Sequence, residues 1–238
     1  MTHAFHLIAH QRWREMVFDD GGMNVLSSQA LDELGQAVNS VHGPIDLLVL
    51  RSGRARLFAA GADMREMSSF DRWDAARFSR IGQKLFESIE RLPFVTLAVI
   101  DGDCFGGALD LALSFDLRWS TSRSRFSHPG AKIGIVTGFG GTSRWRAAVE
   151  PLQARKMFLG NEVFTASRAF DSGLIDRLTE SPLDEIDTLL ATISDRNPSA
   201  IKQVARISEL LSPSQKVLLA RNTFELHRRS NSTNSPRN

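Results

Sequence analysis

The chain of 238 residues contains no tyrosine and a single cysteine, Cys104. One cysteine excludes an internal disulfide framework and a cysteine-rich zinc site, and it fits a reducing compartment, so we expect a cytoplasmic protein. Long hydrophobic runs are also lacking, because the longest, such as residues 95–100, extends over about six residues. A helix that crosses a membrane needs about 20 apolar residues, and we therefore expect no membrane partner.

The chain also lacks an excess of charge of one sign. It has 29 basic and 27 acidic residues and a formal net charge of +2, so nucleic acid is not an expected partner. The six histidines do not show the H-E-x-x-H spacing of a zinc enzyme, and no G-x-S-x-G motif of a serine hydrolase occurs. With no metal site expected, the hydrophobic content of 42% still predicts a globular fold with a buried core.

Strands and helices are predicted to alternate over the first 140 or so residues. Strands are expected at residues 13–18, 46–51 and 95–100. A helix that begins after Ser27 or Ser28 carries an apolar stripe of Leu31, Leu34, Val38 and Val41. A second helix, ended by Pro93, carries Phe78, Ile81, Leu85 and Ile89 at helical spacing.

The rest of the chain is predicted to be mainly helical, over residues 142–149, 151–159, 165–172, 183–194 and 198–211. Gly173 is a typical residue to end the third of these helices. We therefore expect an α/β core over residues 1–180, a helical C-terminal region over residues 181–229, and a disordered tail over residues 230–238, which is rich in Ser and Asn.

Two glycine- and alanine-rich segments stand at predicted junctions between a loop and a helix, residues 58–64 and 101–110. Backbone N–H groups lack partners at the start of a helix, so such places bind anionic oxygen. If the two segments face each other, one N–H from each could hold a developing oxyanion.

Four blocks of the sequence resemble the crotonase, or enoyl-CoA hydratase/isomerase, superfamily over residues 13–176 or so. They are Ala59-Ala60-Gly61-Ala62-Asp63, then residues 98–102 with Gly106-Gly107, the turn at residues 134–142, and residues 169–175. The resemblance implies a crotonase-like spiral of ββα turns. It also implies an oxyanion hole formed by the N–H groups of Ala60 and Gly107. The residues expected to contact an acyl-coenzyme A substrate are Ala60, Gly61, Ala62, Asp63, Met64 and Gly106.

The sequence departs from the family pattern at the two carboxylates that hydratases use. The first position carries Asp110 in place of glutamate, so the acid is shorter by about 1.5 Å. The second position falls on Gly130, which has no side chain. Asp110 is the expected acid or base, with His128 and Thr137 as further candidates in the same pocket, and two-carboxylate hydration is not favoured.

The leading interpretation is an enzyme of this family that stabilises the enolate of an acyl-CoA thioester. No permanent cofactor is expected, since coenzyme A belongs to the substrate, and the resemblance implies a homotrimer or a dimer of trimers. A decarboxylase, thioester hydrolase or ring-forming lyase is an alternative motivated by Gly130. A non-catalytic protein that binds acyl-CoA, or RNA through the basic residues near the C-terminus, is an alternative of another class.

Overall fold

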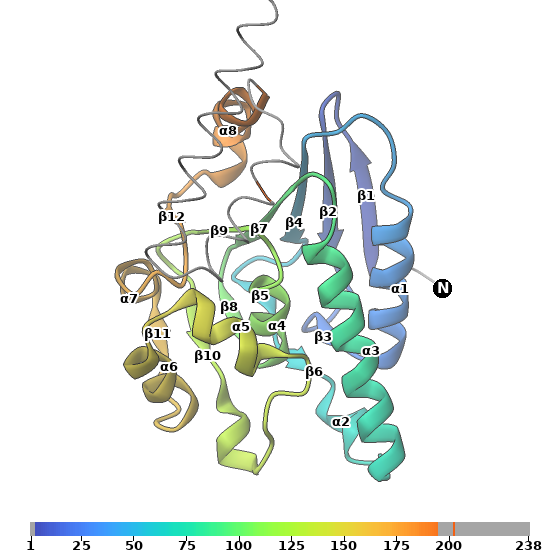
Figure 1. Ribbon diagram of the computed structural model, residues 1–238, viewed down its shortest axis with the longest axis vertical. Coiled ribbons are helices and arrows are strands. Elements are labelled where there is room, and N and C mark those ends of the chain that lie inside the picture. Colours follow the sequence, from blue (N-terminus) through green and yellow to red (C-terminus); the bar gives the residue numbers. More distant parts are fainter. Residues whose placement is uncertain (1–2, 195–201, 203–238) are drawn as a thin grey trace, which may run out of the picture. The chain divides into compact units, whose positions relative to one another are not determined.

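The structure is a computed structural model that describes residues 3–194 and residue 202. The chain divides into two compact units, residues 1–199 and 200–238, and the labelled strands and helices of Figure 1 all belong to the first unit. Of the predicted helix at residues 198–211 only residue 202 is described, and it is helical, whereas the predicted tail at residues 230–238 lies outside the described residues.

A six-stranded sheet forms one layer, with the strand order β1-β2-β4-β7-β9-β12. Its neighbours are parallel except β1 and β2, which form an antiparallel pair. The central strands β4 and β7 are almost continuous runs of buried aliphatic residues, as is typical of parallel strands covered on both faces. The strands are β1 (Phe5–Ala9), β2 (Trp13–Phe18), β4 (Leu47–Ser52), β7 (Val95–Ile100), β9 (Leu117–Ser120) and β12 (Arg177–Leu178).

Four strands of the large sheet, β2, β4, β7 and β9, are each followed in the chain by a short strand of one of two smaller sheets. Each such pair of strands, with the helical segment after it, forms one structural repeat. One of the smaller sheets has the order β11-β10-β8-β5, and the other pairs β3 with β6. Each repeat thus runs from the large sheet into a small sheet and then into a helical segment, as in β7, β8 and α4 (Figure 1). The short strands are β3 (Val25–Leu26), β5 (Leu57–Ala59), β6 (Gly61–Ala62), β8 (Asp103–Phe105), β10 (Arg125–Ser127) and β11 (Phe164–Thr165).

Helices α1 and α3 lie side by side against the sheet (Figure 1). Ser27 caps α1, because its side chain accepts a hydrogen bond from the Ala30 N–H, and Asp71 and Asp74 form a capping box at the start of α3. The helices are α1 (Ser28–Asn39), α2 (Met64–Met67), α3 (Arg72–Glu90), α4 (Gly107–Ala112), α5 (Gly141–Ala148), α6 (Pro151–Phe158), α7 (Ala166–Asp171) and α8 (Ile186–Ser194), with 3₁₀ helices η1 (Pro129–Ile133) and η2 (Pro182–Glu185).

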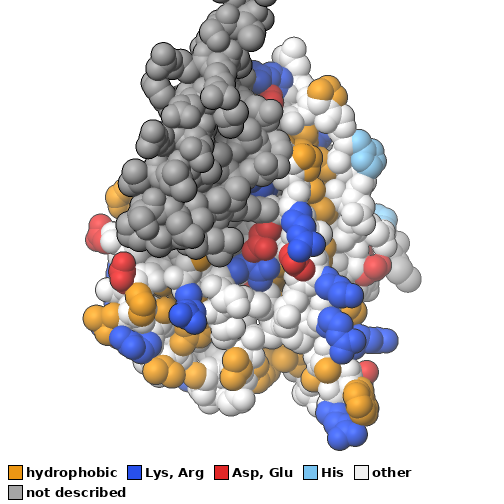
Figure 2. Space-filling view, viewed as in Figure 1, with side chains coloured by type: hydrophobic (Ala, Val, Ile, Leu, Met, Phe, Trp, Pro, Cys, Tyr) orange, Lys and Arg blue, Asp and Glu red, His pale blue; other side chains and the backbone are white. Residues whose placement is uncertain are grey.

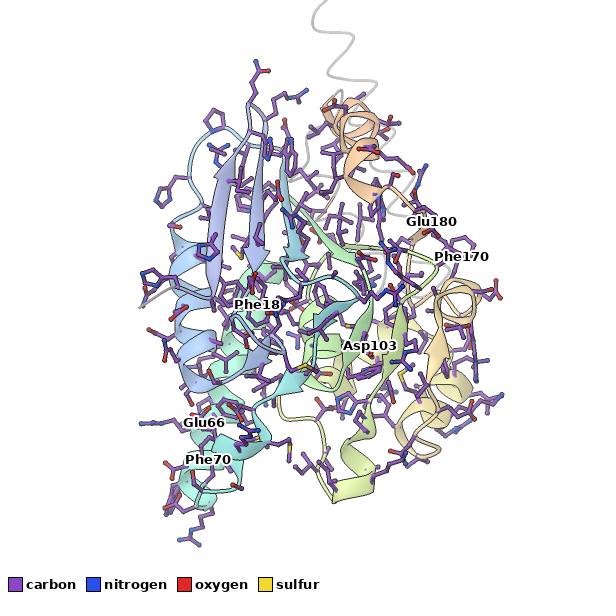
Figure 3. All side chains as sticks on the ribbon, turned by 180° about the vertical axis from the view of Figure 1, so that it is seen from behind. Phe18, Glu66, Phe70, Asp103, Phe170 and Glu180 are labelled. Atoms are coloured by element: carbon purple, nitrogen blue, oxygen red, sulfur yellow. The ribbon has the colours of Figure 1, made fainter. Side chains whose placement is uncertain are left out.

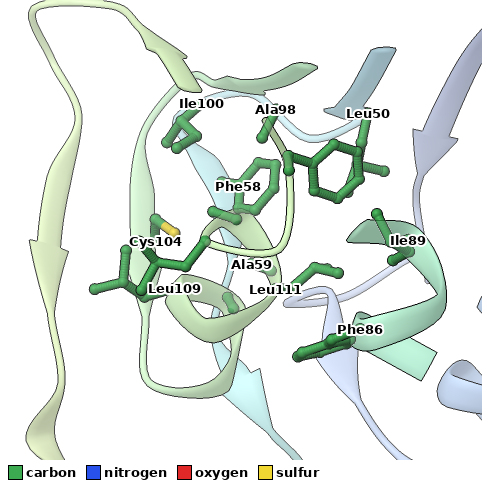
Figure 4. Close-up of a cluster of buried hydrophobic side chains, with 14 of the residues drawn as sticks. Leu50, Phe58, Ala59, Phe86, Ile89, Ala98, Ile100, Cys104, Leu109 and Leu111 are labelled. Carbon is green, nitrogen blue, oxygen red and sulfur yellow. The ribbon is translucent and has the colours of Figure 1, made fainter. Parts of the chain in front are cut away.

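The main hydrophobic core lies between the large sheet and the helices that follow the small-sheet strands. Phe58, Cys104 and Leu109 are fully buried among its side chains (Figure 4). No helix in the described part of the chain is both long enough and apolar enough to cross a membrane.

The alternating α/β architecture predicted from the sequence is confirmed, and several details need correction. Strand β1 was not expected, although it pairs with β2 over five residues. On α3, Ile81 is exposed, whereas Gly82 and Phe86 are buried beside Phe78 and Ile89. The helix expected at residues 183–194 starts as the 3₁₀ helix η2 and becomes regular only at Ile186.

Candidate active site

Three loops meet at one edge of the four-stranded sheet because they follow neighbouring parallel strands. Ala60 comes directly after β5, Gly106 after β8, and His128 after β10. Strands β5, β8 and β10 are adjacent and parallel, so their carboxyl ends, where ligands bind in parallel α/β sheets, lie at the same edge. Segments separated by almost 70 residues in the sequence are thereby brought together.

The first two loops approach each other so closely that a side chain is excluded at Gly61 and fits poorly at Gly107. A Cβ atom on Gly61 would lie 2.6 Å from the Phe105 carbonyl oxygen and 3.0 Å from the Gly107 nitrogen. Gly61 also has a φ of +106°, a conformation that side chains disfavour. A Cβ on Gly107 would lie 3.3 Å from the Ala62 nitrogen. The backbones around residues 62 and 107 are therefore in direct contact.

The expectation that Ala60 supplies an oxyanion-hole donor needs correction. Its N–H donates to the Met23 carbonyl oxygen at 3.0 Å and is therefore used by the fold. Further along the chain, the Asp63 N–H donates to the Leu26 oxygen of β3 at 3.2 Å. The Ala62 nitrogen, by contrast, lies beside Gly107, since a Cβ on Gly107 would lie 3.3 Å from it. Ala62 rather than Ala60 is the partner that the geometry offers to Gly107.

Gly107 begins helix α4, and its N–H has no acceptor within that helix because the first four N–H groups of any helix lack one. The preceding residue, Gly106, donates its own N–H to the Ser127 oxygen at 2.9 Å. The predicted role of Gly107 as a donor at a helix start thus fits its place in the fold.

Asp110 is the buried carboxylate of the site, with 1% of its surface exposed. It projects from α4 toward the first residue of α5, since a Cβ on Gly141 would lie 1.9 Å from Oδ1. The partial positive charge of a helix N-terminus favours an anion there. Burial, together with the negative charges of Asp110 and Asp103, raises the pKa of the Cys104 thiol well above its usual range.

Thr137 donates its hydroxyl hydrogen to Asp110 Oδ2, so these two predicted residues are brought together. The loop that carries Thr137 is held by α3. Ser79 Oγ and Gln83 Nε2 both donate to the Gly138 carbonyl oxygen, at 2.5 and 2.8 Å. Helix α3 therefore fixes the loop that orients the carboxylate.

His128 faces the other oxygen of the same carboxylate. Its Nε2 lies 3.5 Å from Asp110 Oδ1, and neither atom has a hydrogen-bond partner. The imidazole is buried and packs on the ring of Phe158, with centroids 4.8 Å apart, and Phe158 in turn packs on Trp145. Aromatic packing thus holds the ring in place, and Nε2 is left free of hydrogen bonds.

Gly130 lies in η1, where hydratases carry their second carboxylate, and the space beside it is filled. A Cβ on Gly130 would lie 2.5 Å from the Ile135 carbonyl oxygen, and Ile135 donates its N–H to the Gly130 oxygen at 2.9 Å. The loop that follows η1 therefore folds back over the position that a second carboxylate would need.

These residues line a pocket of about 430 Å³. Of the predicted site residues, Ala60, Ala62, Met64, Gly106, Gly107, Asp110, His128, Gly130 and Thr137 line it. Gly61 and Asp63 do not. Gly61 serves the loop contact, and the Asp63 carboxylate caps α2 by accepting from the N–H groups of Arg65 and Glu66.

Most of the pocket wall is apolar and was not identified from the sequence. Met67, Phe70, Phe78 and Phe139 contribute to it, and Ile133 and Val136 line it while remaining exposed. Phe70 lies near Glu66 where α2 leads into α3 (Figure 3). Hydrophobic side chains gather along the lower edge of the face in Figure 2, over α6 and the segment of η1. These side chains come from separate elements, so no periodic pattern within one element groups them in the sequence.

No metal site is found in the part of the chain that the structure describes, because no three His, Cys, Asp or Glu side chains are grouped to hold an ion. Asp110 and His128 are the only ionisable side chains among the described residues of the pocket wall. The site can hold an anionic oxygen at the loop amides and exchange a proton with Asp110.

Residues 14–227 match the family model described as enoyl-CoA hydratase/isomerase. The chain belongs to the enoyl-CoA hydratase/isomerase family. It is an enzyme of the crotonase superfamily, as the four sequence blocks indicated. A crotonyl-CoA hydratase of Syntrophomonas wolfei is 31% identical over 184 residues, which are 76% of this chain and 71% of that protein.

Solved structures show the same fold. An enoyl-CoA hydratase of Thermoplasma volcanium has a TM-score of 0.86 at 20% identity, covering 94% of this chain and 92% of that one. Pseudomonas aeruginosa DspI has a TM-score of 0.84 at 24% identity, covering 94% of this chain and 88% of that one. The predicted crotonase-like fold class is thereby confirmed.

Proposed function

We propose that this family member binds an acyl-CoA thioester and forms its enolate, with the thioester oxygen held by the N–H groups of Ala62 and Gly107. The observation that carries the proposal is the contact between these two backbones beside the buried Asp110. Two N–H donors that converge on a developing oxyanion contribute strongly to catalysis, and loss of one typically costs about 10²- to 10³-fold in rate.

Asp110 is the base of the proposed reaction. Its carboxylate removes a proton from the α-carbon of the acyl group, and the electrons of the broken C–H bond move onto the thioester oxygen. For a 3-enoyl thioester, the electrons on the oxygen then restore the carbonyl bond, and a double bond forms between the α- and β-carbons. The electrons of the former β,γ double bond take the proton from Asp110 at the γ-carbon. The product is the conjugated 2-enoyl thioester, and Asp110 is again ionised.

Isomerisation is the reaction that this pocket supports best, because it can proceed with one carboxylate. Two-carboxylate hydration lacks its second acid, since Gly130 has no side chain and the Ile135 oxygen lies where one would begin. The filled space beside Gly130 likewise gives no support to the decarboxylase, hydrolase and ring-forming alternatives. The apolar wall suits a hydrocarbon acyl group.

The test compares purified wild type with Asp110→Asn on 3-enoyl-CoA and 2-enoyl-CoA substrates, by absorbance of the conjugated thioester and by product analysis. We expect isomerisation by the wild type and a loss of about 10²- to 10⁴-fold in Asp110→Asn, the usual contribution of general acid–base catalysis. Binding of the substrates is measured separately by calorimetry. A wild type that binds no acyl-CoA ester contradicts the proposal.

The assembly inferred from the family resemblance and the compartment inferred from the single cysteine are part of the same proposal. A homotrimer or dimer of trimers is expected in light scattering, and cytoplasmic localisation is expected in cell fractionation. No cofactor beyond the coenzyme A of the substrate is needed for the proposed chemistry.

A further inference from the structure

The pair formed by Asp110 Oδ1 and His128 Nε2 has an unusual hydrogen-bonding state. Both atoms are buried without a partner, and they lie 3.5 Å apart, longer than a hydrogen bond. Buried polar atoms in proteins are nearly always hydrogen-bonded. A single proton placed between these two atoms would give each of them a hydrogen-bond partner. The two side chains are therefore arranged to accept one proton together.

We infer that His128 shares the proton that Asp110 takes from the substrate and thereby replaces the second carboxylate that is missing at position 130. This inference rests on the proposed function. In the inferred starting state, the carboxylate is ionised and Nε2 carries no hydrogen. The proton removed from the α-carbon binds Oδ1 and forms a hydrogen bond with Nε2, and its transfer to Nε2 gives an imidazolium beside a carboxylate.

The return step reverses the transfer, so that the proton passes from Nε2 to Oδ1 and from there to carbon. The charge of the pair changes from −1 to neutral and back, and no oxidant, reductant or further reactant is consumed. Because His128 reaches the substrate proton only through Asp110, it acts as a positioning residue and proton partner. The mechanism thus keeps a second proton-binding group without a side chain at Gly130.

The surroundings of His128 support this role. Asp110 on α4 is the one charged partner that the described residues place against the ring. Phe158 on α6 covers a face of the imidazole, Gly130 of η1 lies next to it, and Cys104 on β8 is close enough to Asp110 to feel its charge. A purely structural histidine in such an apolar site would be expected to bond its ring nitrogens to backbone groups, and Nε2 does not.

The experiment measures exchange of the α-protons of butanoyl-CoA with deuterium in D₂O, by NMR, between about pD 5 and pD 9, the range in which histidines titrate. This substrate has no double bond, so it reports proton removal alone. The variant His128→Gln keeps an N–H donor that can reach Asp110 Oδ1 but cannot take up a proton. Phe158→Leu alters the packing of the ring and retains the imidazole.

In His128→Gln we expect the exchange rate to fall on the order of 10²-fold and its pD profile to differ from that of the wild type, because the second proton acceptor of the pair is lost. Phe158→Leu, which retains the imidazole, keeps the wild-type profile. If His128→Gln retains the wild-type rate and the wild-type pD profile while Asp110→Asn is inactive, the inference is overturned and the proposed function stands. If the wild type neither binds nor exchanges butanoyl-CoA, the proposed function itself fails.

Discussion

Gly141→Ala is the sharpest test of how α5 shapes the site. The added Cβ would lie 1.9 Å from Asp110 Oδ1 and 2.6 Å from its Cγ, whereas ordinary contacts begin at 3.4 Å. The carboxylate or the start of α5 must therefore move by about 1.5 Å. A misplacement on the order of 1 Å can cost about 10²-fold in rate, and we expect a loss of at least that size.

The stability effect of Gly141→Ala should be much smaller than its effect on activity. Alanine favours a helix over glycine by up to about 1 kcal/mol, which offsets part of the overpacking cost of about 1 to 3 kcal/mol. Thermal unfolding and isomerisation of a 3-enoyl-CoA are therefore measured on the same preparation. The expected variant is folded and bound to substrate but slow.

Gly138→Ala is the matched control, since Gly138 lines the same pocket on the same loop. Its added Cβ would lie 3.4 Å from Ser79 Oγ, an ordinary contact, and its φ lies outside the left-handed region. We expect activity within about threefold of wild type, because a substitution that causes no clash has a small effect on the structure around it. Equal activity of Gly141→Ala and Gly138→Ala would refute the reasoning, because it would show that Asp110 needs no fixed position.

Two further predictions concern Cys104 and Asp63. Burial and the charges of Asp110 and Asp103 raise the pKa of the Cys104 thiol, so the native protein should resist thiol-modifying reagents at pH 8 or so that label it fully in denaturant. Because of the raised pKa, the folded state retains a proton that the unfolded state loses when the pH rises above the usual thiol range. The free energy of unfolding should therefore fall over that pH range, and it should fall less in Cys104→Ala. An equal fall in both proteins would contradict this prediction. Asp63→Ala removes the cap of α2 and should lower the free energy of unfolding by about 1 kcal/mol, whereas Asp63→Asn, which can still cap, should lose less in denaturant titrations.

Local features of the fold could be predicted because neighbouring residues determine them. Ser27 caps α1, Gly173 follows α7 with a φ of +79°, and β7 is a buried aliphatic run, all as spacing and residue type indicate. Strand β1 escaped prediction because only its first residue is buried, so it lacks a clear alternating pattern. Its pairing with β2 depends on the partner strand.

The candidate site shows the same division. The glycine and alanine blocks and Asp110 are recognisable in the sequence because close backbone approach and acid chemistry restrict the residue types at those positions. The oxyanion-hole amide on this loop was wrongly predicted to be that of Ala60. The Ala60 N–H donates to the Met23 oxygen instead, and this hydrogen bond exists only once β3 and β6 are paired. Likewise, the sequence by itself determined that position 130 has no carboxylate. Only the tertiary structure placed the Ile135 oxygen there and the His128 ring beside Asp110, because these contacts join loops whose separation in space is set by the register of β5, β8 and β10.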